Sequence, residues 1–157
     1  MKKVVLSLLG LAFGISLMAQ SNKEEIELYQ SAFGMEKKAI VAEFIKLDSV
    51  AGVSFWADYD EYETARKIHG QKRIALMIKY SEQYETLNDE NTEKLMSEMI
   101  DLGNEYNKLI AKYYKSIKKG SGVKAAAQFM QIESYFQSVI RLEIFKSIPL
   151  IGEFDKK

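Results

Sequence analysis

The stretch from Asp89 to Ile117 constrains the fold more than any other part of the sequence, because its apolar residues recur at alternating steps of four and three. This spacing predicts a long amphipathic helix with one broad apolar stripe. The two adjacent rows of the stripe are Leu95, Met99, Leu102, Tyr106, Leu109 and Tyr113, and Met96, Ile100, Gly103, Ile110, Tyr114 and Ile117. A helix of about thirty residues is roughly 45 Å long, so further helices must cover this stripe.

Apolar rows elsewhere in the chain predict those further helices. We expect helices over residues 24–47, 50–85, 89–119 and 122–147. The connections between them are short, which favours antiparallel neighbours. The predicted fold class is therefore all-α, with four long antiparallel helices that follow a signal peptide and form an elongated or curved bundle.

Residues suited to helix ends stand at the expected boundaries. Asp48 or Ser49 can accept hydrogen bonds from the first amides of the second helix, and Asn88 can do the same for the third. Gly120 is placed to end the third helix. Pro149 is the only proline and stops the fourth helix.

The second expected helix carries apolar residues on two opposite faces. One face is Phe55, Tyr59, Tyr62, Leu76, Tyr80 and Tyr84, and the other is Val53, Trp56, Ala57, Ile74, Ala75 and Ile78. Such a helix is either buried between neighbours or packed on one side while it offers the other side to a partner. The general preference for core over interface favours burial. The alternative makes an exposed aromatic row for partner binding, and its candidate residues are Phe55, Tyr59, Tyr62, Tyr80 and Tyr84.

The first twenty residues are typical of a secretory signal peptide. Lys2 and Lys3 precede an apolar run over residues 4–18, and the small residue Ala19 comes before polar sequence. We therefore expect a cleaved segment over residues 1–20, a single helical domain over residues 21–157, and a periplasmic or secreted location. The chain has no cysteine, so a lipid anchor at the cleavage site and disulfides are excluded. After cleavage no stable membrane anchor is expected.

No residue pattern points to catalysis, to a metal or to a cofactor. His69 is the only histidine, and neither a Glu-x-x-His spacing nor a Gly-x-Ser-x-Gly motif accompanies it. A solvent-facing side chain is the expected state of this histidine. A solvated helix face is also the better explanation of the acidic run Asp58, Asp60, Glu61 and Glu63. The 22 basic and 22 acidic residues leave no basic excess, which argues against nucleic acid.

Two helix starts are similar to a known motif. Residues 87–91, Leu-Asn-Asp-Glu-Asn, resemble the Leu-Thr-x-x-Gln motif, and residues 47–51, Leu-Asp-Ser-Val-Ala, are a weaker echo. The chain thereby resembles the LTxxQ-motif family of periplasmic helical proteins, which includes the Spy and CpxP stress proteins. Residues 129–150 also look like the last helix of small exported proteins related to that group. The resemblance implies an ATP-independent chaperone or envelope-stress modulator, a curved helical dimer that binds unfolded or partner proteins on its concave side.

These observations lead to two hypotheses about function. The first is a non-enzymatic helical protein that binds other polypeptides through an aromatic helical face, in which a homodimer is one expected assembly. The alternative is a regulatory domain that binds a metal or small ligand and reports through an envelope signalling partner. An enzyme ranks last, because no acid, base and nucleophile converge in the sequence.

Overall fold

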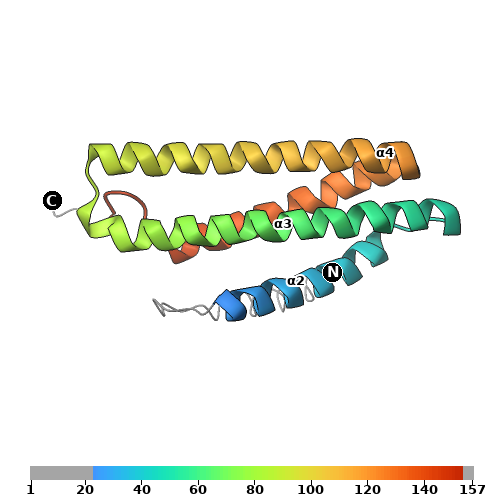
Figure 1. Ribbon diagram of the computed structural model, residues 1–157, viewed down its shortest axis with the longest axis horizontal. Coiled ribbons are helices and arrows are strands. Elements are labelled where there is room, and N and C mark those ends of the chain that lie inside the picture. Colours follow the sequence, from blue (N-terminus) through green and yellow to red (C-terminus); the bar gives the residue numbers. More distant parts are fainter. Residues whose placement is uncertain (1–22, 154–157) are drawn as a thin grey trace.

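The protein is all-α in the part of the chain that the structure describes. The computed structural model describes residues 23–153, with side chains from residue 33 onward, and no strand occurs in this range. Figure 1 shows an elongated molecule built from helix α2 (Lys23–Phe44), helix α3 (Ser49–Gln83), the short 3₁₀ helix η1 (Tyr84–Thr86) and helix α4 (Asp89–Ser147). The predicted fold class is confirmed at this level. The expected signal peptide over residues 1–20 lies outside the described residues.

The described range contains three α-helices, whereas the sequence predicted four. The expected third and fourth helices are one element, α4, which spans 59 residues. Inside it, Gly122 leaves the helical conformation with a φ of 91° and a ψ of 166°. The chain turns back at this residue without a loop, so α4 has a first arm (89–121) and a second arm (123–147) that run in opposite directions (Figure 1). The break was expected at Gly120, which was wrong: the helix continues through Gly120 and Ser121, and Gly122 makes the break two residues later.

The predicted helix starts are confirmed. The Asp48 side chain caps α3, because its Oδ1 accepts hydrogen bonds from the amides of Val50 at 3.0 Å and Ala51 at 2.9 Å. The Asn88 side chain caps α4 and accepts from the Asn91 amide at 3.0 Å. A cap of this kind contributes about 1 kcal/mol to stability. These contacts fix where α3 and α4 begin.

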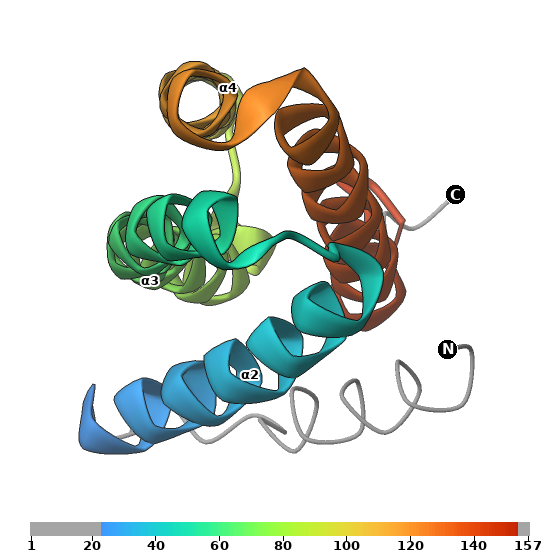
Figure 2. The same cartoon turned by 90° about the vertical axis from the view of Figure 1, so that its right-hand side faces the viewer.

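The core lies in the half of the molecule that contains the Gly122 turn. Figure 2 looks along the long axis and shows α2, α3 and the two arms of α4 arranged around this interior. All four segments contribute buried residues to one cluster: Val41, Ile45, Phe55, Tyr59, Tyr62, Tyr113, Ile117, Ala125, Ala126, Phe129, Ile132 and Phe136. The turn itself packs on the start of α3, where the Ser121 hydroxyl donates to the Ala51 carbonyl at 2.8 Å.

The other half of the molecule is more loosely covered. The second arm of α4 starts beside the first arm at the turn and diverges from it along the molecule (Figure 1). The apolar stripe over residues 89–117 is therefore buried at Leu95, Tyr113 and Ile117, whereas Met99 is 46% exposed and Ile100 is 64% exposed. Because the second arm of α4 diverges from the first arm, it does not cover the whole apolar stripe, and parts of the stripe stay exposed.

Two tyrosine hydroxyls form hydrogen bonds between the end of α3 and the residues that follow α4. The Tyr80 hydroxyl donates to the Pro149 carbonyl at 2.7 Å, and the Tyr84 hydroxyl, in η1, donates to the Leu150 carbonyl at 2.8 Å. The residues just after α4 are thus held against the end of α3. Within the described range, none of the helices has the length and apolar character that crossing a membrane requires.

Candidate functional site

The five aromatic residues predicted as a partner-binding row lie mostly in the interior. Phe55, Tyr59 and Tyr62 are fully buried, Tyr80 is 8% exposed, and Tyr84 is partly buried. Of the two interpretations of this helix, the structure shows burial between neighbours for the first four residues. In this arrangement Phe55, Tyr59 and Tyr62 are out of reach of a partner, and they form the wall of a site that holds charged groups.

That site is an ion-pair cluster at the centre of the core. The ammonium of Lys37, on α2, lies 2.6 Å from Glu63 Oε1, on α3, and 2.7 Å from Glu133 Oε2, on the second arm of α4. Lys37 and Glu133 are completely buried. Arg66 completes the cluster, because its Nε donates to Glu63 Oε1 at 2.9 Å. Two cations and two carboxylates therefore balance one another inside the protein, as buried charges require.

Tyrosine hydroxyls extend the cluster toward the first arm of α4. The Tyr62 hydroxyl donates to Glu133 Oε2 at 2.6 Å and lies 3.3 Å from the Tyr106 hydroxyl. Among the side chains that the structure describes, three buried polar atoms have no hydrogen-bond partner: the Tyr59 hydroxyl, Glu63 Oε2 and Glu133 Oε1. The cluster therefore has more acceptor capacity than its own donors use.

Aromatic rings enclose the Lys37 ammonium on its remaining sides. The ammonium lies 5.0 Å from the ring centroid of Tyr62, 5.4 Å from that of Phe136 and 5.7 Å from that of Tyr59. Ring faces attract a cation electrostatically at these distances, most strongly when water is excluded. Carboxylates and rings together make a cage suited to one primary ammonium.

The cage shifts the pKa values of its members. Burial raises the pKa of the Tyr59 and Tyr62 hydroxyls, and the Glu133 carboxylate adds to this effect. Burial and Glu133 also raise the pKa of Tyr106 to about 12. Burial alone would raise the pKa of the Glu63 carboxyl, but the charges of Lys37 and Arg66 outweigh it and the pKa is lowered. The three tyrosine hydroxyls are therefore neutral, and Glu63 is an anion, at neutral pH.

The sequence alone indicates that Lys37, beside Lys38, carries ordinary surface charge, and this interpretation is wrong because Lys37 is completely buried. The solvated helix face expected for the acidic run is wrong for Glu63, whose side chain is 15% exposed and pairs with Lys37. Arg66 and Glu133 were not predicted as site residues.

Lys37, Arg66 and Glu133 could each have been found in the sequence, because each is a charged residue at a position where the helical spacing predicts an apolar one. Lys37 is four residues from both Phe33 and Val41, and Glu133 lies between the core positions 129 and 136. Charged residues at such positions mark buried ion pairs when two helices carry opposite signs.

His69 is buried, contrary to the expectation that it faces solvent. Its exposure is 7%, because the first arm of α4 packs over it and the Tyr106 ring centroid lies 5.3 Å from its own. Its Nε2 lies 2.9 Å from the Leu102 carbonyl oxygen, which can only accept, so Nε2 carries the proton. Burial lowers the His69 pKa and outweighs that hydrogen bond. In the described range, no three His, Cys, Asp or Glu side chains come together as they would around a metal ion.

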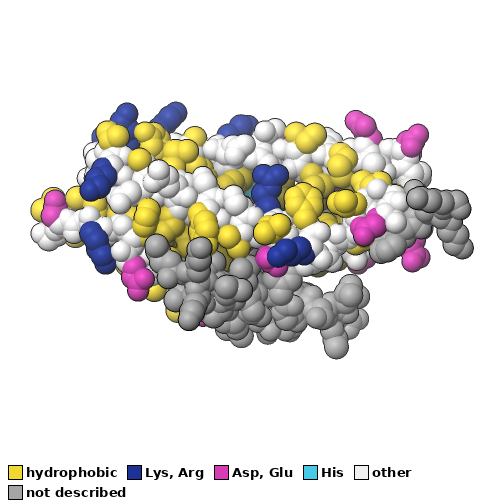
Figure 3. Space-filling view, turned by 180° about the vertical axis from the view of Figure 1, so that it is seen from behind, with side chains coloured by type: hydrophobic (Ala, Val, Ile, Leu, Met, Phe, Trp, Pro, Cys, Tyr) yellow, Lys and Arg dark blue, Asp and Glu magenta, His cyan; other side chains and the backbone are white. Residues whose placement is uncertain are grey.

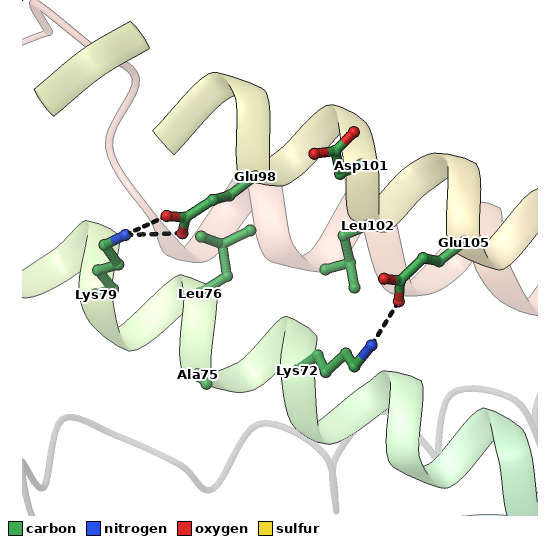
Figure 4. Close-up of a pocket in the computed structure, with 8 residues that line it drawn as sticks. All are labelled: Lys72, Ala75, Leu76, Lys79, Glu98, Asp101, Leu102 and Glu105. Atoms are coloured by element: carbon green, nitrogen blue, oxygen red, sulfur yellow. Dashed lines mark hydrogen bonds and ion pairs between the residues drawn. The ribbon is translucent and has the colours of Figure 1, made fainter. Parts of the chain in front are cut away.

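An open groove lies on the surface between α3 and the first arm of α4 (Figure 4). Its volume is about 420 Å³, and Ala75, Leu76 and Leu102 form its apolar part. Ion pairs close both ends. Lys79 lies 2.6 Å from Glu98 Oε1, and Lys72 lies 2.7 Å from Glu105 Oε2. The two pairs involve four of the five charged side chains that line the groove, and Asp101 is the fifth (Figure 4).

The second arm of α4 carries an exposed apolar stripe. We use the name outer stripe for Tyr135, Ser138, Leu142 and Phe145, which follow one another at steps of three and four. Tyr135 is 47% exposed, Leu142 is 55% exposed and Phe145 is 54% exposed. Figure 3 shows the molecule from the side of the second arm, where hydrophobic side chains are spread among other side chains and a few charged ones. This spacing is that of a helix face that packs on another helix.

Comparison with known proteins finds no family model that matches the chain, and no similar protein among curated sequences or solved structures.

Proposed function

We propose that the protein is a non-enzymatic helical protein that binds other polypeptides, after export through the signal peptide at residues 1–20. The proposal follows the resemblance to the LTxxQ-motif family, with ATP-independent chaperone or envelope-stress activity in the periplasm. The observation that carries it is the outer stripe, in which large apolar side chains about half exposed follow a heptad-like spacing. We infer that α2, α3 and the two arms of α4 act as a bundle that supports this stripe.

The chemistry of the outer stripe suits weak, reversible contact with apolar segments. Leu142 and Phe145 are three residues apart and present neighbouring side chains. Covering apolar surface contributes about 25 cal/mol per Å², and a few half-exposed side chains therefore give modest affinity. The ion pair between Lys146 and Glu143, at 2.8 Å, lies beside them and keeps the surrounding surface polar. Such a surface can hold an unfolded segment and release it without ATP.

The test is a client-aggregation assay with a double variant of the outer stripe. Purified protein should suppress aggregation of a chemically denatured client in the absence of ATP, and Leu142→Ser with Phe145→Ser should remove most of that activity. The matched control is Val50→Ser with Val53→Ser, because these residues are 81% and 74% exposed on α3 and are also three apart. Equal activity of the two double variants would contradict a role for the outer stripe.

Light scattering of the protein without a client shows whether the outer stripe is free or is occupied by a second copy of the chain. A monomer leaves the outer stripe free for clients. A dimer that the outer-stripe variant dissociates would identify the bound polypeptide as a second copy.

A further inference from the structure

The walls of the ammonium cage come entirely from α3 and α4. Glu63, Tyr59 and Tyr62 lie on α3, and Glu133 and Phe136 lie on the second arm of α4. Helix α2 contributes the ammonium of Lys37 that fills the cage, and its Phe33 ring packs on the outside of the cage, 6.5 Å from the Phe136 ring centroid. The cage and its occupant are therefore on different elements, as in a binding site that is filled by a ligand.

The cage is matched to a primary ammonium. An ammonium has three N–H donors, and two of the Lys37 contacts are short, at 2.6 and 2.7 Å, to two different carboxylates. Glu133 is completely buried, yet its Oε1 has no hydrogen-bond partner, and the buried Tyr59 hydroxyl has none either. Acceptors and ring faces thus point to a cation with several donors.

Helix α2 is attached in the manner of a docked peptide. Its buried contacts on the described side chains follow one face: Lys37, then Val41 four residues on, and Ile45 just past the helix end. Residues 45–48 are non-helical and link it to α3. On its outer side Met35 is 71% exposed. An amphipathic helix with anchors four residues apart is a common form of peptide recognition.

We propose that the surface formed by α3 and the second arm of α4 is a recognition site for lysine-bearing helical segments, and that Lys37 of α2 is its resident occupant. A polypeptide with a lysine followed by apolar residues four and eight positions later displaces α2 and places its own ammonium between Glu63 and Glu133. This inference rests on the proposed polypeptide-binding function and specifies the class of segment that is bound.

The experiment measures binding of a fluorescent peptide of residues 33–47 to the full chain by anisotropy. The Lys37→Ala chain lacks the resident ammonium, and it should bind the peptide about tenfold more tightly than the wild-type chain does. The same peptide with methionine in place of the lysine should bind the Lys37→Ala chain about tenfold more weakly. The control chain Lys38→Ala keeps the cage filled, because Lys38 pairs outside it with Asp60, and should behave like the wild-type chain.

A second measurement covers the case in which Lys37→Ala unfolds. n-Butylammonium should raise the melting temperature or the helix content of that variant, whereas n-butanol and sodium chloride at equal concentration should not. Adding Glu133→Gln to Lys37→Ala should remove the response. Equal binding of the two peptides, or no response to n-butylammonium, would overturn the inference. The client assay on the outer stripe does not involve Lys37, so it would still report on the proposed function.

Discussion

Glu133 is the residue on which the buried charges depend most. Its Oε2 accepts from both Lys37 and Tyr62, and the residue has no solvent-exposed surface. Breaking a buried ion pair by removing one partner costs about 3–5 kcal/mol, because the other charge stays buried without compensation. We expect Glu133→Gln to lower the free energy of unfolding by about 3 kcal/mol in urea denaturation.

The control for this prediction is Glu98→Gln, which breaks the surface pair with Lys79. Both side chains of that pair are about one-third exposed or more, so a loss of about 1 kcal/mol or less is expected. Similar losses for the two variants would mean that the core pair is no more important than a surface pair.

Tyr59 and Tyr62 provide a matched comparison of hydroxyl groups. The Tyr62 hydroxyl donates to Glu133, whereas the equally buried Tyr59 hydroxyl has no partner. Tyr62→Phe should therefore cost about 1–3 kcal/mol, while Tyr59→Phe should be neutral or stabilising, since it removes an unsatisfied polar atom. Thermal unfolding of the two variants measures both changes in stability. A larger loss for Tyr59→Phe would show that its hydroxyl has a partner.

Acid should destabilise the protein in two stages. Burial lowers the His69 pKa below its ordinary value, so the unfolded chain takes up a proton first and stability falls as the pH decreases below about 6.5. The lowered pKa of Glu63 stabilises the fold above the unfolded value of about 4.3, and that contribution is lost as the pH falls through the folded value. Urea midpoints measured from pH 7.5 down to about pH 2 follow both stages.

His69→Gln isolates the first stage, because glutamine retains an N–H donor for the Leu102 carbonyl but does not titrate. Its urea midpoint should be nearly constant between about pH 7 and 5. An unchanged pH dependence in this variant would assign the first stage to another group.

At the scale of elements, the reversal inside α4 depends on Gly122. Its φ of 91° with a ψ of 166° is a conformation that side-chain-bearing residues avoid at a cost of about 1–3 kcal/mol. Gly122→Ala should be destabilising by that amount in chemical denaturation. Gly103 is the control, because it is helical and a Cβ there would meet nothing within 4 Å. Gly103→Ala should stabilise the protein by up to about 1 kcal/mol, and the same sign for both variants would exclude a special role for Gly122.

The starts of helices were predictable where a side chain at the boundary caps the helix. Asp48 and Asn88 cap helices in the structure as their side chains indicated. The joining of two expected helices into α4 was not predictable, because Gly120 and Gly122 both suit a helix end and only packing selects between them. A Cβ at Gly120 would lie 2.1 Å from Ser54 Oγ, so close approach to α3 explains that glycine.

The candidate site was predictable only in part. The aromatic row on α3 was recognised, and Phe55, Tyr59 and Tyr62 do line the cage. Their burial depends on α2 and α4, which approach from distant parts of the sequence. The pairing of Lys37 with Glu133 spans 96 positions, and helical periodicity says nothing about contacts over such a separation.

At the scale of the whole molecule, the proposed polypeptide binding uses two different surfaces. The outer stripe lies on the exposed side of the second arm of α4, and the ammonium cage lies on the side of the same arm that faces α2 and α3. Under the proposed function, a client that first contacts Leu142 and Phe145 would be held on the same element that carries Glu133. We therefore expect binding at the outer stripe and displacement of α2 to be separable steps on one helix.

Site-specific photo-crosslinking tests the polypeptide-binding proposal most directly. A photoreactive phenylalanine analogue at position 142 of the full chain should capture a denatured client on irradiation without ATP, and the same analogue at position 53 should capture little, although Val53 is the more exposed of the two residues. Equal capture at both positions, or none at position 142, would contradict the account.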